Sequence, residues 1–395
     1  MPQNGYFLIA DITGYTAYLN QSELDHAQHI LTSLLNLLIA HTKPPLILSR
    51  LAGDAVISYG LRDHFFQGQT FLEMLEDTYV AFRRAIDLMV LNTTCPCNAC
   101  KNIASLDLKF FVHYGTFGIQ KLDAHDELVG SDVIVIHRLL KNHVTEKTGC
   151  RAYALFTHAA IQQLGIENPE QFLKAHRETY EHLGKVKVWI QNMHPVWDKR
   201  ATLKIEIPPA QLLTEQSADF PVPVEVMWDV LADPNYRSPI LNAIRQEIHH
   251  RQHGRIVPGS AFRCYHGDGR VTTQTVLEWR PFEQMTTEDT TPVPKTTVLV
   301  QFHLSPLESP LGKDSGLPGT RLTVRASTAR GPWLNRKICD LVGKKILATV
   351  FQKGLQVLRT MLEQDLATGK YSLSPPVHLP LQDIQQAALD SLAGE

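Results

Sequence analysis

The sequence lacks three features that would each point to a particular class of protein. No stretch is long and apolar enough to span a bilayer, and the N-terminus lacks the charged-then-apolar pattern of a signal peptide. The net charge is only −2, so no basic field argues for a nucleic-acid partner. We therefore expect a cytoplasmic protein with no membrane span and no nucleic-acid partner.

Cysteine is also scarce, with six residues among 395, and three of them crowd into Cys95-Pro-Cys97-Asn-Ala-Cys100. This crowding argues against a disulfide framework. Three thiolates within one turn could bind Zn²⁺, with a fourth ligand from elsewhere such as His113 or Cys150. They could also form a redox-sensitive dithiol, or a tight loop whose small side chains pack inside. The sequence leaves these three interpretations open.

The remaining composition is that of an ordinary soluble protein. The hydrophobic fraction is 44% and the charged fraction 20%, enough to bury a sizeable core. A chain of 395 residues suggests two or three domains. We place the first domain at residues 1–195, the second at 200–367, and a polar tail at 368–395.

The first domain is organised around the stretch from Phe7 to Thr16. Its apolar run predicts a buried strand that ends at Asp11 and a glycine turn. A hairpin further on carries Gly53 and Asp54 at its tip. Two carboxylates at strand ends could hold a divalent cation and the phosphates of a nucleotide. The alternative is that Asp11 caps a helix and Asp54 fills a turn.

The periodicity of the first domain predicts helices over residues 23–42, 71–91 and 133–140. It predicts strands over 106–113 and 116–120, broken at Tyr114-Gly115, and further strands over 152–156 and 182–191. The resulting order, β-α-β-β-α-β-β-α-β, indicates an α+β sandwich whose helices are segregated from a mixed sheet.

Four motifs in this domain resemble those of class III adenylate and guanylate cyclases, in the order and approximate spacing of that family. They occupy residues 10–16, 50–55, 111–118 and 127–139. The resemblance covers about residues 1–195 and implies a ferredoxin-like, cyclase-type fold. It places Asp11 and Asp54 at the positions that bind Mg²⁺ or Mn²⁺, with Ile12 adding a backbone carbonyl. It places Arg138 on the reacting phosphate, although this residue could also be a helix-surface arginine.

The resemblance extends to the residues that read the purine, where Arg50 and Glu127 stand in place of the family's lysine and aspartate. Glu127 could instead be an exposed turn carboxylate. Ile134 stands where the family has an asparagine, and Leu183 where it has a lysine, with Lys185 nearby. The resemblance thus implies binding of a nucleoside triphosphate with metal more strongly than cyclase activity. Because such sites form between two domains and this chain shows one copy, it also implies a homodimer or a cyclase-like partner chain.

The second domain resembles the START or polyketide-cyclase-like (SRPBCC) superfamily, mainly in its order of elements. We predict a strand over residues 203–207, a helix over 221–231, antiparallel strands from 244 to 327 and a long helix to about 366. The motif at residues 220–234 resembles that superfamily's opening helix. Such helix-grip folds hold a hydrophobic small molecule between the sheet and the long helix. Side chains could equally fill that space.

Two functions follow. The first is a divergent, cyclase-like signalling protein that binds a nucleotide with metal and is tuned by a ligand in its second domain. The alternative is a non-enzymatic carrier of a lipophilic ligand, in which the cyclase-like domain is an inert dimerisation platform.

Overall fold

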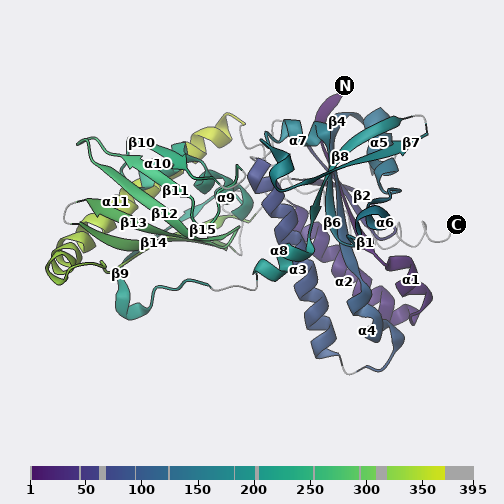
Figure 1. Ribbon diagram of the computed structural model, residues 1–395, viewed down its shortest axis with the longest axis horizontal. Helices are drawn as coiled ribbons and strands as arrows, with labels where there is room; N and C mark the ends of the chain where they lie inside the picture. Colours follow the sequence, from purple (N-terminus) through teal and green to yellow (C-terminus); the bar gives the residue numbers. More distant parts are fainter. Residues whose placement is uncertain are drawn as a thin grey trace. The chain divides into compact units, whose positions relative to one another are not determined.

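The computed structural model describes residues 2–43, 46–61, 68–93, 95–122, 125–181, 183–200, 204–251, 254–292, 295–307 and 318–369. The chain divides into two compact units, one within Met1–Thr202 and the other within Leu203–Pro375. Both units combine helices with an extended sheet (Figure 1). None of the helices in these ranges has the length and apolar character needed to cross a membrane. The polar tail expected from residue 368 lies, beyond its first two residues, outside the described part of the chain.

The first unit is built on a mixed sheet with strand order β2-β3-β1-β4-β6-β8-β7, and β5 pairs with β4. The β4–β6 pair is parallel, and the other pairs are antiparallel. Its strands are β1 (Gln3–Thr13), β2 (Ile47–Ala52), β3 (Ala55–Leu61), β4 (Asp107–Leu122), β5 (His125–Val129), β6 (Tyr153–Thr157), β7 (Lys174–Tyr180) and β8 (Gly184–Asn192).

The central strand β1 explains why its sequence is apolar without alternation. It lies between β3 and β4, and its residues from Gly5 to Ala10 are all buried. Phe7 and Ile9 belong to a core cluster that includes Ile136 and Leu139 of helix α5 (Ser131–Leu139). Burial on both faces therefore explains why this strand lacks the alternating apolar and polar pattern of a half-exposed strand. The partly buried Asp11 directly follows this continuous run of buried residues.

Two long helices of the first unit, α2 (Leu24–Thr42) and α3 (Gly68–Asn92), pack against each other. Apolar residues at helical spacing supply their buried faces, as the sequence predicts for residues 23–42 and 71–91. The shorter helices are α1 (Tyr15–Asn20), α4 (Asn98–Asn102), α5, α6 (Val144–Thr148), α7 (His158–Gln163) and α8 (His194–Arg200), with 3₁₀ turns at Ile103–Ser105 and Pro169–Gln171.

One strand prediction in this unit is wrong, and one strand was not predicted. The expected break at Tyr114-Gly115 does not exist, because β4 runs unbroken through it. This position requires a glycine because Asp132 packs closely against the strand. A Cβ on Gly115 would lie 2.3 Å from the Asp132 Cγ. Strand β7 was missed because most of its side chains are exposed, so its sequence shows no apolar periodicity.

The second unit is an antiparallel sheet of order β10-β11-β12-β13-β14-β15-β9, against which the long helix α11 packs (Figure 1). Two short helices, α9 and α10, precede the strand run. The bounds are β9 (Leu212–Phe220), α9 (Val224–Ala232), α10 (Pro234–Ile240), β10 (Arg245–His249), β11 (Ala261–Tyr265), β12 (Val271–Arg280), β13 (Gln284–Pro292), β14 (Lys295–Pro306), β15 (Thr320–Ser327) and α11 (Trp333–Ala367), with a 3₁₀ turn at Pro209–Gln211.

The strand expected at residues 203–207 is also wrong, since residues 204–208 have no regular structure. Side chains hold this segment instead of a strand ladder. The Ile205 amide donates to Glu278, and its carbonyl accepts from Gln284 and Gln301 at 2.9 and 2.7 Å. The strand that completes the sheet edge is β9, which was not predicted.

The long helix α11 has all its buried residues in its C-terminal half. Phe351, Leu355, Leu358 and Leu362 are buried. In the N-terminal half, Trp333, Leu334, Ile338, Leu341, Val342 and Ile346 are exposed, with Leu341 83% accessible.

Candidate metal and nucleotide sites

Asp11 and Asp54 come together from two neighbouring strand ends. Asp11 near the end of β1 pairs with Ala55, the first residue of β3, and Asp54 immediately precedes Ala55 in the β2–β3 turn. The amide of Ile12 donates a hydrogen bond to the backbone carbonyl of Asp54 at 3.3 Å. Gly53 supplies the left-handed backbone of this turn, with φ of +62°. The two acidic residues singled out in the sequence are therefore neighbours.

Their electrostatics show that both carboxylates carry an unfavourable charge. Burial, together with the nearby charge of Asp11, raises the pKa of Asp54 to about 7. Burial also raises the pKa of Asp11, while Lys109 lowers it. The charge of Asp54 in turn adds to the effect of burial in raising the pKa of Tyr15. Such a pair of repelling, half-buried acids suits a cation.

Lys109 belongs to this arrangement, and nothing in the sequence singled it out. It lies directly opposite Asp11 in the β1–β4 register. Burial lowers the pKa of Lys109, while the charge of Asp11 opposes that shift. Its ammonium also stands 5.3 Å from the ring centroid of Tyr153. One cation thus offsets two carboxylates only in part.

Arg50 and Glu127, the residues expected at the purine, form an ion pair. The Arg50 Nη1 lies 2.7 Å from the Glu127 Oε1, and both side chains are partly exposed. The pair joins β2 to β5, because Glu127 lies on β5. Nearby, burial lowers the pKa of His137, Arg50 lowers it further and Glu127 opposes this. Glu127, for which the alternative was an exposed turn carboxylate, thus lies on a strand and is paired with Arg50.

An open groove of about 680 Å³ lies along β5 and α5, and residues 128–130, 133, 134, 137, 138 and 141 line it. Arg138 contributes an exposed side chain that forms no ion pair with any described residue. Ile134 is 56% exposed in the same groove. The groove is thus mainly apolar, with Arg138 on its wall.

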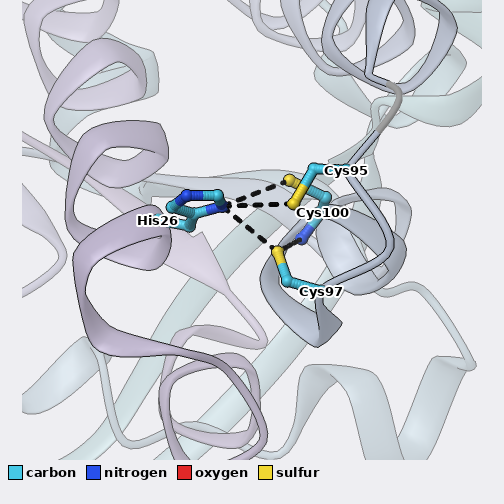
Figure 2. A group of neighbouring side chains, drawn as sticks. All are labelled: His26, Cys95, Cys97 and Cys100. Carbon is cyan, nitrogen blue, oxygen red and sulfur yellow. Dashed lines mark hydrogen bonds between the residues drawn. The ribbon is translucent and has the colours of Figure 1, made fainter.

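The three clustered cysteines meet a histidine that sequence reasoning missed. Figure 2 shows Cys95, Cys97 and Cys100 around the imidazole of His26. The two candidates suggested for a fourth ligand lie elsewhere: His113 bonds Thr157 and Asp132, and Cys150 is outside the group. None of the six cysteines is in a disulfide.

The second unit buries an arginine beneath its sheet. Arg237 of α10 is fully buried, its guanidinium carbon lies 3.9 Å from the ring centroid of Phe262, and one of its nitrogens bonds Gln274. Burial lowers the pKa of Arg237 to about 10. Its Nε and Nη1 have no hydrogen-bond partner among the described residues. Gln274 also bonds Asp289, and burial raises the pKa of that carboxyl to about 6.

The sequence resembles a family and a relative that both lack an assigned function. The family described as "Protein of unknown function (DUF2652)" matches residues 31–148. An uncharacterized protein of Mycobacterium tuberculosis is 38% identical over 63 residues. That match covers 16% of this chain and only 30% of the relative.

Solved cyclase structures resemble about half of the chain. A bacterial light-regulated adenylyl cyclase is 12% identical with a TM-score of 0.37, covering 49% of this chain and 52% of its own. The adenylyl cyclase CyaB from P. aeruginosa is 15% identical with a TM-score of 0.35, covering 48% of this chain and 94% of its own. These identities and TM-scores are low, so the likeness supports no conclusion about activity.

Proposed function

We propose that the first unit binds a nucleoside triphosphate together with Mg²⁺ or Mn²⁺, as a divergent cyclase-like signalling domain. The observation that carries this proposal is the adjacency of Asp11 and Asp54 at two paired strand ends, where burial raises the pKa of both carboxyls, the charge of Asp11 adds to the shift of Asp54, and Lys109 lowers the pKa of Asp11. Folding two like charges into one half-buried corner costs free energy. A divalent cation offers the missing counter-charge.

The residues present fit such a cation. Carboxylates and backbone carbonyls are the hard oxygen donors that Mg²⁺ and Mn²⁺ prefer. In our proposal Asp11 and Asp54 provide the carboxylates, and Ile12 the carbonyl. When bound, the cation would offset phosphate charge and lower the pKa of an attacking hydroxyl.

The nucleotide-binding site would be completed across the interface of a homodimer. Arg50 and Glu127 offer a hydrogen-bonding pair for a purine, and Arg138, which pairs with no acidic residue in the described part of the chain, offers its guanidinium for a phosphate. These groups line or adjoin the open groove, which a second copy could cover. Ile134 cannot donate the hydrogen bond that would orient a ribose, so we propose nucleotide binding as the primary function and cyclisation as a secondary one.

Metal-dependent binding tests the proposal. The affinity of the full chain for ATP and GTP is measured by calorimetry with Mn²⁺ and with a chelator in its place. We expect binding only with metal, and a loss of at least about tenfold in Asp11→Asn and Asp54→Asn. Such a loss corresponds to about 1.4 kcal/mol.

The control is Glu167→Gln, which removes the same charge from an exposed carboxylate of the same unit. Equal nucleotide affinity with and without metal, or in Asp11→Asn and the parent chain, would overturn the metal site. Assay of cyclic product in the same samples separates a weak cyclase from a receptor.

A second candidate function, binding of a hydrophobic small molecule, is favoured by Arg237 of the second unit. A fully buried guanidinium whose Nε and Nη1 find no acceptor among the described residues is costly unless a ligand accepts from them. We propose that a START-like second unit takes an apolar molecule that ends in an acidic or carbonyl group. In the carrier alternative the ligand would occupy the same site, and the first unit would serve only for dimerisation.

Native mass spectrometry of the full chain tests this candidate. We expect a co-purifying small molecule that is lost in Arg237→Met, a substitution of similar length without charge. Circular dichroism shows whether the variant folds. A folded Arg237→Met that retains the same ligand would rule out the arginine as its anchor, and a parent chain that carries and takes up no apolar acid would rule out the function.

A further inference from the structure

We propose that His26, Cys95, Cys97 and Cys100 form a structural Zn²⁺ site that ties the start of α2 to α4 and the residues just before it. One ligand atom from each residue lies within 4.8 Å of the others. This inference is independent of nucleotide binding, because it uses none of the residues assigned to that function.

The separations match a tetrahedral zinc ion. With Zn–S bonds of about 2.3 Å and a Zn–N bond of about 2.0 Å, tetrahedral angles place each sulfur about 3.5 Å from the nitrogen. The His26 Nδ1 lies 3.2 Å from the Cys97 Sγ, 3.5 Å from the Cys95 Sγ and 3.9 Å from the Cys100 Sγ. Figure 2 shows the three sulfur atoms converging on this one nitrogen.

The backbone holds these ligands in place by itself. Cys97 caps the start of α4, and its sulfur accepts from the Cys100 amide at 3.4 Å. Glu23, which precedes α2, accepts from the Ala99 amide at 3.0 Å and so fixes the first turn of α2, which carries His26, beside α4.

The donor set selects zinc and a structural role. Three thiolates and one imidazole in tetrahedral array suit Zn²⁺ better than hard cations such as Mg²⁺. Four protein ligands also leave no open position for water or substrate, as in structural sites. The three cysteines form one side of the site and His26 of α2 forms the other. Cys95, the cysteine nearest to His26 in the sequence, follows it by 69 residues. The ion would therefore act as a cross-link between two helical segments.

Metal analysis of the full chain, purified under reducing conditions without chelator, tests the site. We expect about one zinc per chain. Replacement by Co²⁺ should give the absorption bands of a tetrahedral ion together with thiolate charge-transfer bands. Outer-shell changes already weaken metal binding by about 10–100-fold, so His26→Asn and Cys97→Ser should weaken it at least as much.

Two matched variants serve as controls. His29→Asn changes an exposed histidine one turn further along α2, and Cys150→Ser changes a cysteine of the same unit outside the cluster. Both should keep the zinc content and the Co²⁺ spectrum. Because Cys97→Ser could misfold, the decisive readouts are the spectrum of the parent chain and of His26→Asn.

Three results would overturn the site. One is a parent chain that neither carries zinc nor gives thiolate charge-transfer bands with Co²⁺. Another is a His26→Asn variant with unchanged zinc affinity and spectrum. The third is a disulfide among the three cysteines in the metal-free protein as isolated, which would favour the dithiol interpretation.

Discussion

Replacing Asp54 by asparagine should stabilise the metal-free protein, although it removes a proposed ligand. The Asp54→Asn variant keeps the backbone carbonyl that accepts from the Ile12 amide, and asparagine suits a turn as well as aspartate does. What the substitution removes is the charge that burial and Asp11 make unfavourable. The variant therefore exchanges function for stability.

The magnitude follows from the pKa of Asp54. Its folded-state pKa is about 7, whereas that of an unfolded aspartate is about 3.9. Because the folded pKa is raised, the cost is absent near pH 4, grows as the pH rises and is complete above pH 7. Three pKa units correspond to about 4 kcal/mol. Allowing for residual solvation, we expect a gain of about 2–4 kcal/mol at pH 8, or about 5–10 °C in the Tm of the first unit.

Thermal unfolding at pH 8 and pH 4, with chelator present, measures this gain. The difference between Asp54→Asn and the parent chain should be large at pH 8 and close to zero at pH 4. Glu167→Gln, an equal charge change at an exposed site, should shift Tm little at either pH. Added Mn²⁺ should stabilise the parent chain more than the variant. A Tm at pH 8 that is unchanged or lowered by Asp54→Asn would refute the reasoning.

Two further substitutions, one in each unit, test buried contacts. Glu178 is 1% exposed and bonds two histidines. Burial raises its pKa, but the hydrogen bonds outweigh burial and lower the pKa overall. The contribution of Glu178 to folding stability is therefore full above about pH 4.3 and is lost as the pH falls through the lowered pKa. Glu178→Gln should cost about 2–4 kcal/mol at pH 7 in denaturant unfolding and less below pH 4, and a constant difference would contradict this. Gly354→Ala should cost about 1–3 kcal/mol because its Cβ would lie 2.4 Å from the Ile240 Cα. Gly343→Ala on the same helix meets only an ordinary contact at 3.7 Å and should be neutral or stabilising; equal effects at both glycines would exclude the steric cause.

The parts of the fold that could be predicted are those where burial leaves a periodic trace. The sequence predicts a helix over residues 23–42, and α2 is Leu24–Thr42, because its buried positions recur at helical spacing. Strand β1 was found from its apolar run. The exposed edge strand β7 has no such trace, and β9 was likewise missed. Gly115 misled the prediction because a glycine required for close packing looks the same in sequence as one required for a turn.

The residues of the candidate sites likewise divide into those with a local sequence signal and those without one. Asp54 follows Gly53 directly and Asp11 lies three residues before Gly14, each near a strand end, so local sequence was enough to single them out. His26 has no local signal, since only the packing of α2 against α4 brings it to the cysteines. Lys109 and Arg237 likewise acquire their importance from burial and register, which depend on contacts distant in the chain.

The Asp132 side chain at the start of α5 has a consequence for motion within the first unit. One of its oxygens accepts from the Thr116 amide at 2.7 Å and the other from His113 at 3.1 Å, both on β4. This double tether means that α5 cannot slide along the sheet without breaking both bonds. Helix α5, with Arg138, and strand β4 should therefore move as one rigid body, and a Cβ added at Gly115 would displace Asp132 and break this coupling.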